Sequence, residues 1–382
     1  MRVAMLSGPD GPRWPDAWQR AAATVADVVE LVVVGSLSAP PLPGLPFAGR
    51  DARSPRRYEI EAAHRERSRP AAGSAGQRDT AGRVEAVLRF ASAEYGAVDV
   101  LHAHTPGAAG RLPWLSQATG IPYVLSEHDR RWLGHPSRPL PGLLDRRRAA
   151  RLYREAAAVL PVSDALLARI GELGLPGRHL LVPNPVDTEA LPRVPARVRI
   201  SQDPVRVVAA GPLVGNEGWD VLVDAFAEAL DKDARLRLRI IGDGPGVDAV
   251  QEHIQRSGAG GAAVLAGDLG RKETLHALAH ADLFADPRHV SGFGTTALDA
   301  LCCGTPVVGT RTGALPELVG GDGGILVPPC DPQALARALV EAAAELPLRQ
   351  PAALAARTRR HFGPQTVGAR LATVYTEASG RA

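Results

Sequence analysis

Short apolar runs alternate with amphipathic stretches along this chain, an order that predicts repeated β-α-β units. The run RVAMLS at Arg2–Ser7 leads through a glycine-proline loop into a helix-like stretch at 16–26 and a second apolar run at 28–34. The order begins again at Val205–Ala210, which leads through a glycine loop into a helix-like stretch at 219–230. Such units build doubly wound parallel sheets. The predicted fold class is therefore α/β, with two Rossmann-like halves.

The length of the chain, 382 residues, exceeds what one hydrophobic core usually serves. Further apolar runs extend both halves, at 98–102, 122–125, 159–163, 236–242, 263–266, 283–285 and 307–308. The turn-forming stretch VPNPVD closes the first half. We predict an N-terminal domain, a linker, a C-terminal domain and a final helical segment, at 1–190, 191–204, 205–362 and 363–382.

The region 40–82 interrupts this regularity. It is rich in Pro, Arg, Ala and Gly and shows no alternation of apolar and polar residues. This composition predicts an excursion on the surface. The alternative is an acceptor-side lid, with Arg53, Arg56 and Arg57 facing an anionic group.

Composition narrows the class of protein. Hydrophobic residues make up 45% and charged residues 22%, as in an ordinary globular enzyme, and the net charge is only +3. So small a charge gives no reason to expect nucleic acid as a partner. No apolar run approaches the ~20 residues of a membrane span. Three cysteines are too few for a disulfide framework, and no signal-like segment follows Met1, so we expect a cytoplasmic location.

The segment 288–308, RHVSGFGTTALDALCCGTPVV, is the one around which the second half is organised. Gly292 and Gly294 predict a turn that a Cβ would obstruct, and Thr295 and Thr296 are the expected caps of the helix that follows. A glycine loop feeding a helix N-terminus offers unpaired N–H groups to a phosphate.

Four motifs in order and spacing then carry a resemblance. The segment 288–308, together with IIGDGPG at 240–246, VLAGDLG at 264–270 and VPNPVD at 182–187, resembles the retaining glycosyltransferases of the GT-B fold, family-4 type. The resemblance implies two Rossmann-like domains facing across a cleft, with the last helix crossing back onto the first domain. It implies transfer from a nucleotide sugar such as a UDP or GDP sugar, without metal or cofactor, to an unidentified acceptor. Peripheral membrane contact stays open, because such enzymes often have lipid acceptors.

Site residues follow from the resemblance, position by position. His128, after the strand at 122–125, matches the histidine presented to the donor's sugar and phosphates; the alternative is a loop histidine bonded to local backbone. His104 follows another strand and is expected to be a satisfied histidine lining the cleft. The first loop lacks the family's Gly-Gly pair, which leaves Gly11 and Arg13 as weak acceptor-side candidates. The donor-binding candidates are Gly211, Asp243, Leu269, Ser291, Gly292, Phe293, Gly294, Thr295, Thr296 and Asp299.

The chain departs from the family at the residues that neutralise the donor. The usual Arg and Lys of the loop that opens the second domain are replaced by Pro212 and Glu217, and the two usual glutamates by Ser291 and Asp299. Asp299 can still accept hydrogen bonds from ribose, whereas a serine hydroxyl is a weaker acceptor than a carboxylate. The nearest replacement cations in sequence are Arg288, His289 and Arg311.

Three functions remain open on this pattern. One is an active transferase with a remodelled donor site, in specialised-metabolite or glycoconjugate biosynthesis. The second is a transferase whose donor is a phosphorylated sugar without a nucleotide diphosphate. The third is an inactive GT-B module kept as a binding or partner subunit. The base, the sugar, the acceptor and the oligomeric state are not readable from the sequence.

Overall fold

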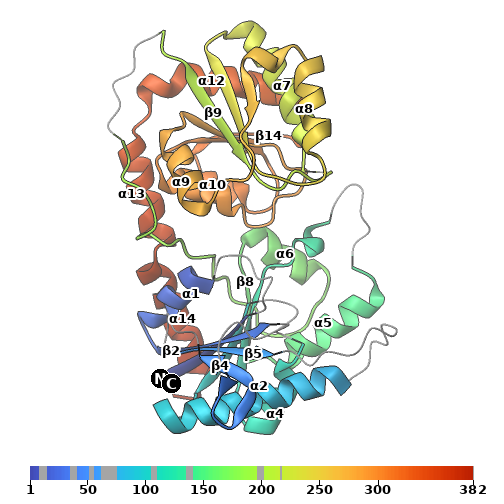
Figure 1. Cartoon of the computed structure of the whole chain (residues 1–382), viewed down its shortest axis with the longest axis vertical. Coiled ribbons are helices and arrows are strands. Elements are labelled where there is room, and N and C mark those ends of the chain that lie inside the picture. Colours follow the sequence, from blue (N-terminus) through green and yellow to red (C-terminus); the bar gives the residue numbers. More distant parts are fainter. Residues whose placement is uncertain are drawn as a thin grey trace. The chain divides into compact units, whose positions relative to one another are not determined.

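The structure, a computed structural model, describes residues 1–7, 15–34, 41–50, 56–61, 75–104, 110–134, 141–195, 202–215 and 217–381. The chain divides into two compact units (Figure 1). Unit 1 comprises Met1–Asp129, Pro141–Pro185 and Gly363–Ala382. Unit 2 comprises Arg130–Leu140 and Val186–Phe362. The chain therefore enters unit 2 twice and returns to unit 1 for its last helix.

Unit 1 is built on an eight-stranded sheet with the order β3-β4-β5-β2-β1-β6-β7-β8. The apolar run that opens the sequence is β1, and it pairs in parallel with β2 and β6. The bounds are β1 Arg2–Ser7, β2 Asp27–Val34, β3 Pro41–Leu42, β4 Leu45–Arg50, β5 Arg57–Glu61, β6 Val100–Ala103, β7 Tyr123–Glu127 and β8 Ala158–Pro161. From β2 to β8 by way of β1 the neighbours run parallel, as the β-α-β pattern predicts.

The prediction of an irregular excursion at 40–82 is wrong for the residues that the structure describes. β5 adds to β2 in parallel, and β4 pairs with β5 in antiparallel fashion. The segment RYEIE has two buried apolar residues, Tyr58 and Ile60, flanked by polar neighbours. So short a run forms a strand only because it pairs with the edge of β2. The alternative, an acceptor-side lid, stays a hypothesis; Arg56 lies 3.5 Å from Asp27 in an exposed ion pair. Arg53 lies outside the described residues.

The helices of unit 1 are α1 Pro15–Ala23, α2 Ala75–Tyr95, α4 Leu112–Thr119, α5 Leu143–Glu155, α6 Asp164–Glu172 and α14 Pro364–Ala378. The N-cap of α6 is confirmed at Ser163, whose Oγ accepts the Leu166 N–H at 3.2 Å. The C-terminal helix α14 packs against α1, red beside dark blue in Figure 1. Tyr375 of α14 also bonds to His102 of β6, so the end of the chain is part of the unit 1 core.

Unit 2 has a six-stranded parallel sheet with the order β11-β10-β9-β12-β13-β14. The strands are β9 Val205–Ala210, β10 Leu236–Ile241, β11 Ala263–Leu265, β12 Leu283–Asp286, β13 Val307–Thr310 and β14 Gly324–Val327. The helices are α7 Trp219–Lys232, α8 Val247–Arg256, α9 Arg271–His280, α10 Thr295–Cys302, α11 Leu315–Val319, α12 Pro332–Glu345 and α13 Pro351–Phe362. Short 3₁₀ turns lie at Arg130–Leu133, Ala259–Gly261 and Leu346–Leu348.

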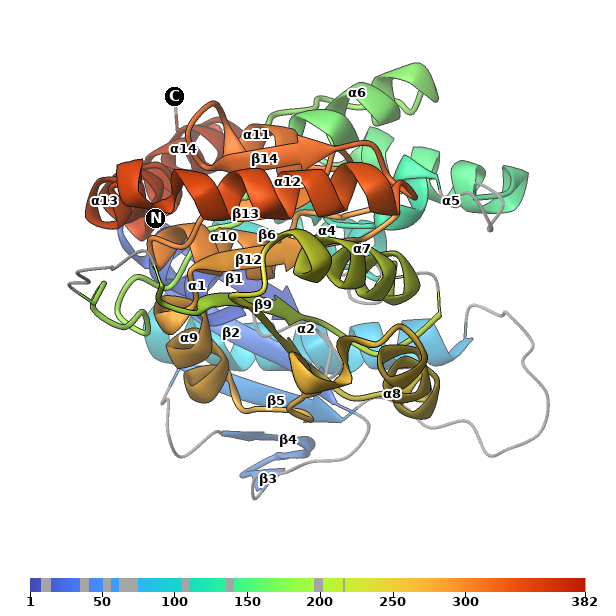
Figure 2. The ribbon, with the colours of Figure 1, turned by 90° about the horizontal axis from the view of Figure 1, so that it is seen from above.

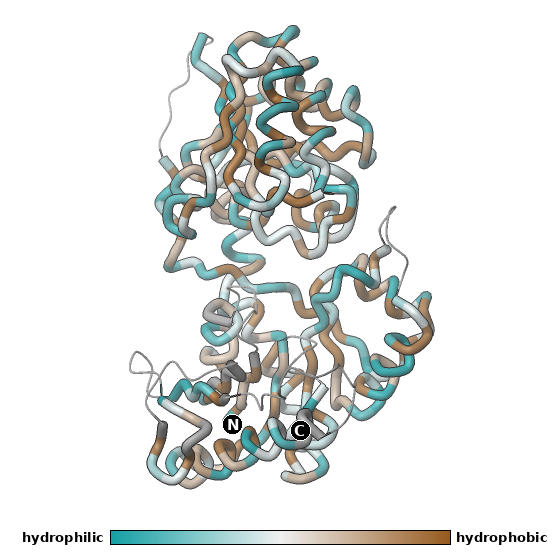
Figure 3. The backbone as a smooth tube through the Cα atoms, turned by 45° about the vertical axis from the view of Figure 1, so that its right-hand side comes forward, coloured by the Kyte–Doolittle hydropathy of each residue, from teal (hydrophilic) through white to brown (hydrophobic). Residues whose placement is uncertain are grey.

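One apolar core holds unit 2 together. Side chains of α7, α8 and α12 pack on the sheet face that carries Leu236, Leu238 and Ile240. Figure 2 shows α12 and α7 lying beside each other along this sheet, and Figure 3 shows its strands as largely hydrophobic. β9 lies inside the sheet, with β10 on one side and β12 on the other. The strand order therefore reverses at β9, and ligands of open α/β sheets bind at the carboxyl ends of strands at such a point.

Candidate active site

The loop between β12 and α10 is built around the N-terminus of that helix. Gly294 is the N-cap, with φ 78°, a left-handed conformation that favours glycine. No side chain caps α10, so the prediction that Thr295 and Thr296 are its caps is wrong; both lie in its first turn. Gly292 has no positive φ, so the backbone conformation of this residue does not require glycine. The first-turn N–H groups are therefore not taken up by a side-chain cap.

Ser291 places an unsatisfied hydroxyl beside this helix end. The residue is fully buried, and its backbone N–H donates to Thr312 Oγ1 at 3.1 Å. Its own Oγ has no hydrogen-bond partner among the described residues. A Cβ built on Gly294 would lie 3.4 Å from that oxygen. Because buried hydroxyls are normally paired, Ser291 Oγ is a candidate to bind a ligand atom or an ordered water. Phe293, also buried, contacts Phe362 edge to face.

The remaining donor candidates of unit 2 stand on loops that follow neighbouring strands. Gly211 follows β9, Asp243 follows β10, and Leu269 lies between β11 and α9. The Asp243 carbonyl accepts the Leu213 N–H at 2.8 Å, and its exposed carboxylate accepts the Gly244 N–H at 2.8 Å. These contacts tie the first two loops together, so Asp243 serves first to shape the site.

The position of the family's lysine holds an acid that is paired. Glu217 is buried, and its Oε1 lies 2.9 Å from Nη2 of Arg130. Arg130 begins a short 3₁₀ turn in the part of the chain that enters unit 2 early. Its Cβ would lie 3.5 Å from a Cβ on Gly292, and half of its side chain is exposed. An arginine 87 positions earlier, which the sequence does not connect with this loop, therefore lies beside the acid at position 217.

Two of the three cations expected from sequence proximity are engaged elsewhere. Arg288 is held by both carboxylate oxygens of Asp286, at 2.7 Å each, inside unit 2. Arg311 donates to the Leu326 carbonyl at 2.9 Å on the exposed side of β13 and β14. His289 lies near the loop, since its Cδ2 would be 3.3 Å from a Cβ on Gly218. Arg288 and Arg311 therefore do not replace the missing clamp.

Asp299, the predicted ribose acceptor, has an internal partner that sequence reasoning missed. Arg271, the first residue of α9, donates to its two oxygens at 2.7 and 3.0 Å. Burial raises the pKa of the Asp299 carboxyl and the hydrogen bonds from Arg271 oppose this, while those bonds raise the pKa of Arg271. The bidentate geometry favours the ionic pair. The ribose role of Asp299 stays a prediction, with Arg271 as the side chain that orients it.

The histidines of unit 1 form a buried cluster at the ends of β6 and β7. His102 bonds through Nδ1 to the Tyr375 hydroxyl at 2.7 Å and through Nε2 to Ser126 Oγ at 2.9 Å. The His104 ring centroid lies 4.1 Å from that of His102 and 6.1 Å from that of His128. Burial lowers the pKa of His104 to about 3 and those of His102 and His128 well below the usual range. All three are neutral at physiological pH.

His104 is not the satisfied histidine that the sequence predicts. Both ring nitrogens are buried, and neither has a hydrogen-bond partner among the described residues. Its neighbour Trp18 of α1, 4.9 Å away between ring centroids, donates through Nε1 to Asn184 Oδ1 at 3.1 Å. The Nδ2 of Asn184 is likewise buried without a partner in the part of the chain that the structure describes. These polar groups, which have no partner among the described residues, lie around one indole and are candidates to contact a polar ligand. Trp18 and Asn184 were not predicted from the sequence.

Gly11 and Arg13, the weak acceptor-side candidates, lie outside the described residues. Within the described ranges no group of three or more His, Cys, Asp or Glu could hold a metal ion. No helix found there is long and apolar enough to cross a membrane.

Two Rossmann-like sheets, one wholly parallel and one parallel from β5 to β8 with antiparallel edge strands, are the architecture of the GT-B glycosyltransferases. Comparison with known proteins gives the family. Residues 25–190 match the profile of Glycosyltransferase Family 4, and residues 204–345 match Glycosyl transferases group 1. This chain belongs to the group 1, family-4 glycosyltransferases.

Its curated relatives act on different acceptors, as their names state. D-inositol 3-phosphate glycosyltransferase of Streptomyces griseus is 30% identical over 329 residues, which cover 74% of this chain and 68% of the relative. A phosphatidylinositol N-acetylglucosaminyltransferase polypeptide of Arabidopsis thaliana is 29% identical over 203 residues. That match covers 53% of this chain and 45% of the relative, so the chain spans less than half of it.

Solved structures confirm the fold over the whole chain. Sucrose-phosphate synthase from Thermosynechococcus elongatus superimposes with a TM-score of 0.77 at 17% identity and covers 100% of both chains. HepE from Anabaena, solved with UDP and glucose, has a TM-score of 0.72 at 19% identity, over 98% of this chain and 99% of its own. The GT-B fold class and the assignment as a glycosyltransferase are therefore confirmed.

Proposed function

We propose that this glycosyltransferase moves a sugar from a nucleotide-activated donor to a small-molecule, glycan or lipid acceptor, with retention of configuration and without a metal. The observation that carries the proposal is the buried hydroxyl of Ser291, which has no partner among the described residues and lies beside the uncapped N-terminus of α10. In a member of this family, that site suits the donor's anionic end. HepE, a structural neighbour, has been solved with UDP and glucose.

The leaving diphosphate would be held by two groups of unit 2. The first is the set of N–H groups in the first turn of α10, where the helix dipole favours negative charge. The second is Arg130, whose guanidinium is half exposed while Glu217 holds one of its nitrogens at 2.9 Å. A guanidinium presents five N–H donors, so pairing with Glu217 leaves donors for phosphate oxygens. Glu217 is then a positioning residue for Arg130.

The ribose and sugar of the donor, and the acceptor, would contact neutral side chains and one carboxylate that Arg271 holds in place. Arg271 fixes the Asp299 carboxylate, which would accept hydrogen bonds from the ribose. His128, with its lowered pKa, can accept or donate a hydrogen bond to sugar hydroxyls without bringing a charge. His104 and Asn184 carry the unsatisfied nitrogens that a hydroxylated acceptor could use.

In the transfer, the bond between the anomeric carbon and the phosphate oxygen breaks and a bond to the acceptor oxygen forms on the same face of the sugar. The nucleoside diphosphate departs with the bonding pair, and the acceptor's hydroxyl proton goes to the phosphate or to solvent. Charge develops on the leaving phosphate, where preorganised donors contribute most to the rate. The α10 amides and Arg130 would therefore stabilise the negative charge that develops on the leaving phosphate.

Calorimetry with the full chain tests the proposal. UDP, GDP and the other nucleoside diphosphates are titrated first, then sugar 1-phosphates and sugar 6-phosphates. We expect saturable binding of one nucleoside diphosphate, and transfer from the matching sugar nucleotide that gives a product of retained anomeric configuration by NMR. An Arg311→Gln chain is the control for the loss of one positive charge in variants of the site, because Arg311 bonds to the Leu326 carbonyl instead of facing the glycine loop.

Other outcomes select the other two functions. Binding of a sugar phosphate alone, with turnover, would replace the nucleotide donor by a phosphorylated sugar. If no nucleotide binds and no sugar phosphate supports turnover, the proposal fails, and an inactive GT-B module kept as a binding or partner subunit becomes the better account.

A further inference from the structure

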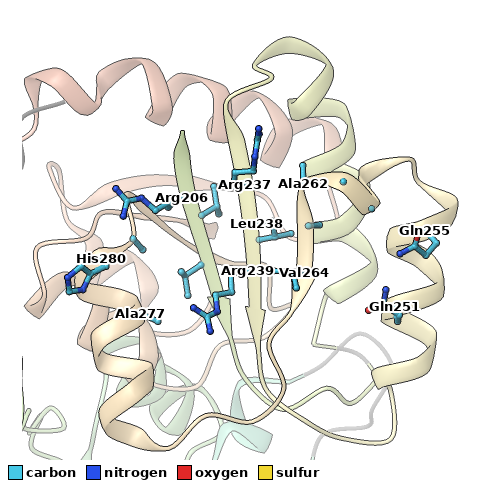
Figure 4. A pocket seen from close by; sticks show the side chains of 16 residues that line it. Arg206, Arg237, Leu238, Arg239, Gln251, Gln255, Ala262, Val264, Ala277 and His280 are labelled. Carbon is cyan, nitrogen blue, oxygen red and sulfur yellow. The ribbon is translucent and has the colours of Figure 1, made fainter. Parts of the chain in front are cut away.

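One pocket of unit 2 lies away from the glycine loop. It is partly open to solvent, has a volume of about 600 Å³ and is lined by residues of β9, β10, β11, α8 and α9. Figure 4 shows Arg206 on β9, Arg237 and Arg239 on β10 and His280 on α9, with the three arginine side chains extending in different directions. Arg206 and Arg237 are each the second residue of their strands. The cavity thus lies toward the amino ends of these parallel strands, whereas the donor loops follow the carboxyl ends.

The arginines occupy positions where a doubly wound sheet is normally apolar. In LRLRII of β10 the leucines are buried in the core of unit 2, while Arg237 and Arg239 are exposed. Parallel strands covered on both faces are usually hydrophobic at every position. Charged residues often protect edge strands, but β9 and β10 lie inside the sheet and β11 is its edge. Neither core packing nor edge protection accounts for them.

The described residues balance the positive charges of this cavity only in part. Arg206 and Arg237 are direct neighbours in the register of β9 and β10, an arrangement that like charges disfavour. Arg206 has Asp282 at 3.6 Å, and Arg237 donates to the carbonyls of Ala234 and Leu236. No hydrogen bond or ion pair holds the Arg239 guanidinium within the described ranges. No Asp or Glu is among the described residues that line the cavity, so two positive charges remain.

We propose that this arginine cavity binds a phosphomonoester, at a site separate from the donor site. Guanidinium groups match phosphate oxygens in a forked geometry. Small-molecule sites measure roughly 300–1,000 Å³, so the cavity has room for a phosphorylated sugar rather than a lone ion. The apolar Ala277 and the half-exposed Val264 border it, and they offer contact area for the organic part of the ligand.

The experiment titrates glucose 6-phosphate into the full chain and into an Arg237→Gln/Arg239→Gln chain. We expect saturable binding by the wild type and at least tenfold weaker binding by the variant. The matched control is Arg256→Gln on α8, an exposed arginine that contacts Glu252 outside the cavity. A single Arg239→Gln chain guards against misfolding, because that guanidinium has no hydrogen bond or ion pair to lose among the described residues. An Arg130→Gln chain should bind glucose 6-phosphate as the wild type does, which separates this site from the donor site.

Vesicles distinguish a lipid headgroup from a soluble ligand. Sedimentation is compared for phosphatidylcholine vesicles with and without phosphatidic acid, a phosphomonoester lipid. Binding to phosphatidic acid vesicles that both arginine variants lose, without glucose 6-phosphate binding, would identify a lipid source of the same chemistry. Equal affinity of wild type and variants for both probes would overturn the proposal. So would weak binding matched by sulfate and inorganic phosphate, the mark of an adventitious ion only.

Discussion

Arg130 and Glu217 form an ion pair in unit 2, with 2.9 Å between Nη2 and Oε1, at the position where relatives of this type carry a lysine. The acid is buried and the base half exposed. Where relatives of this type have a lysine, this chain has an acid, and the acid holds an arginine from another part of the chain. A chain that seems to have lost its phosphate clamp by sequence therefore keeps a cation near the glycine loop.

Arg130→Gln should weaken the binding of a nucleoside diphosphate by about tenfold, with little change for the nucleoside. The reason is that a charge-assisted hydrogen bond contributes about 1.5–3 kcal/mol, and solvent screening of an exposed arginine reduces this toward the lower end. Calorimetry with the diphosphate and the nucleoside measures both. Glu217→Lys in the Arg130→Gln background should recover part of the affinity, because it restores a cation at the family's position. Unchanged diphosphate affinity in Arg130→Gln would remove this residue from the site.

Ser291→Ala should leave stability within about 0.5 kcal/mol of the wild type but reduce kcat/KM, because a hydroxyl without a protein partner loses no internal hydrogen bond. Thr305→Val is the control for a hydroxyl that has a structural partner. Thr305 Oγ1 donates to the Leu278 carbonyl at 2.7 Å, so its loss should cost about 1 kcal/mol. Urea unfolding and steady-state kinetics of both variants decide. A large loss of stability in Ser291→Ala would mean that its hydroxyl is paired within the protein.

Arg271→Met should destabilise the chain more than Asp299→Asn. Removing Arg271 leaves a carboxylate of 5% exposure unpaired, whereas removing the acid leaves an arginine of 36% exposure that can reach water. Breaking a buried pair costs roughly 3–5 kcal/mol, and we expect the lower end for Arg271→Met. Its deficit should shrink at acidic pH, since an unpaired buried carboxylate gains stability on protonation. Urea unfolding at two pH values tests the order, which the reverse ranking would contradict.

His128→Ala should reduce kcat by roughly 10²-fold or more, the scale of side-chain assistance at a reacting centre, while diphosphate binding to unit 2 persists. His276→Ala is the matched control, because His276 is an exposed histidine on α9. Kinetics and calorimetry on the same preparations separate the two effects. Full activity of His128→Ala would assign this histidine to local structure only.

Stability should fall as pH drops below about 6.5, the unperturbed histidine pKa. Burial lowers the pKa of His104 to about 3, so between these values the unfolded chain binds a proton that the folded chain does not. Stability therefore rises with pH across this window, by about 1.4 kcal/mol per pH unit for each such histidine. His104→Gln should flatten the dependence in urea unfolding between pH 7.5 and 5. An unchanged slope would show that His104 takes up its proton without unfolding.

The sequence by itself determined the fold class, the main strands and helices of both halves, and the organising loop at 288–308. These follow from local chemistry: the spacing of apolar residues, glycine at a left-handed position, and a proline that ends a helix. Gly294 illustrates it, because the residue alone predicts the turn that the structure shows. The motifs, in order, were also enough to identify the family.

Only the tertiary structure decided which charges meet. Glu217 looked like the loss of a cation until Arg130, distant in sequence, was found beside it. Asp299 was predicted to be a free acceptor, but Arg271 donates to it. His104 was predicted to be satisfied, but neither of its nitrogens has a partner among the described residues. The strands in the region 40–82 likewise depend on pairing with β2. The physical reason is common to all: apolar periodicity is a property of neighbouring residues, whereas ion pairs, orphaned polar atoms and strand addition are set by where distant segments pack.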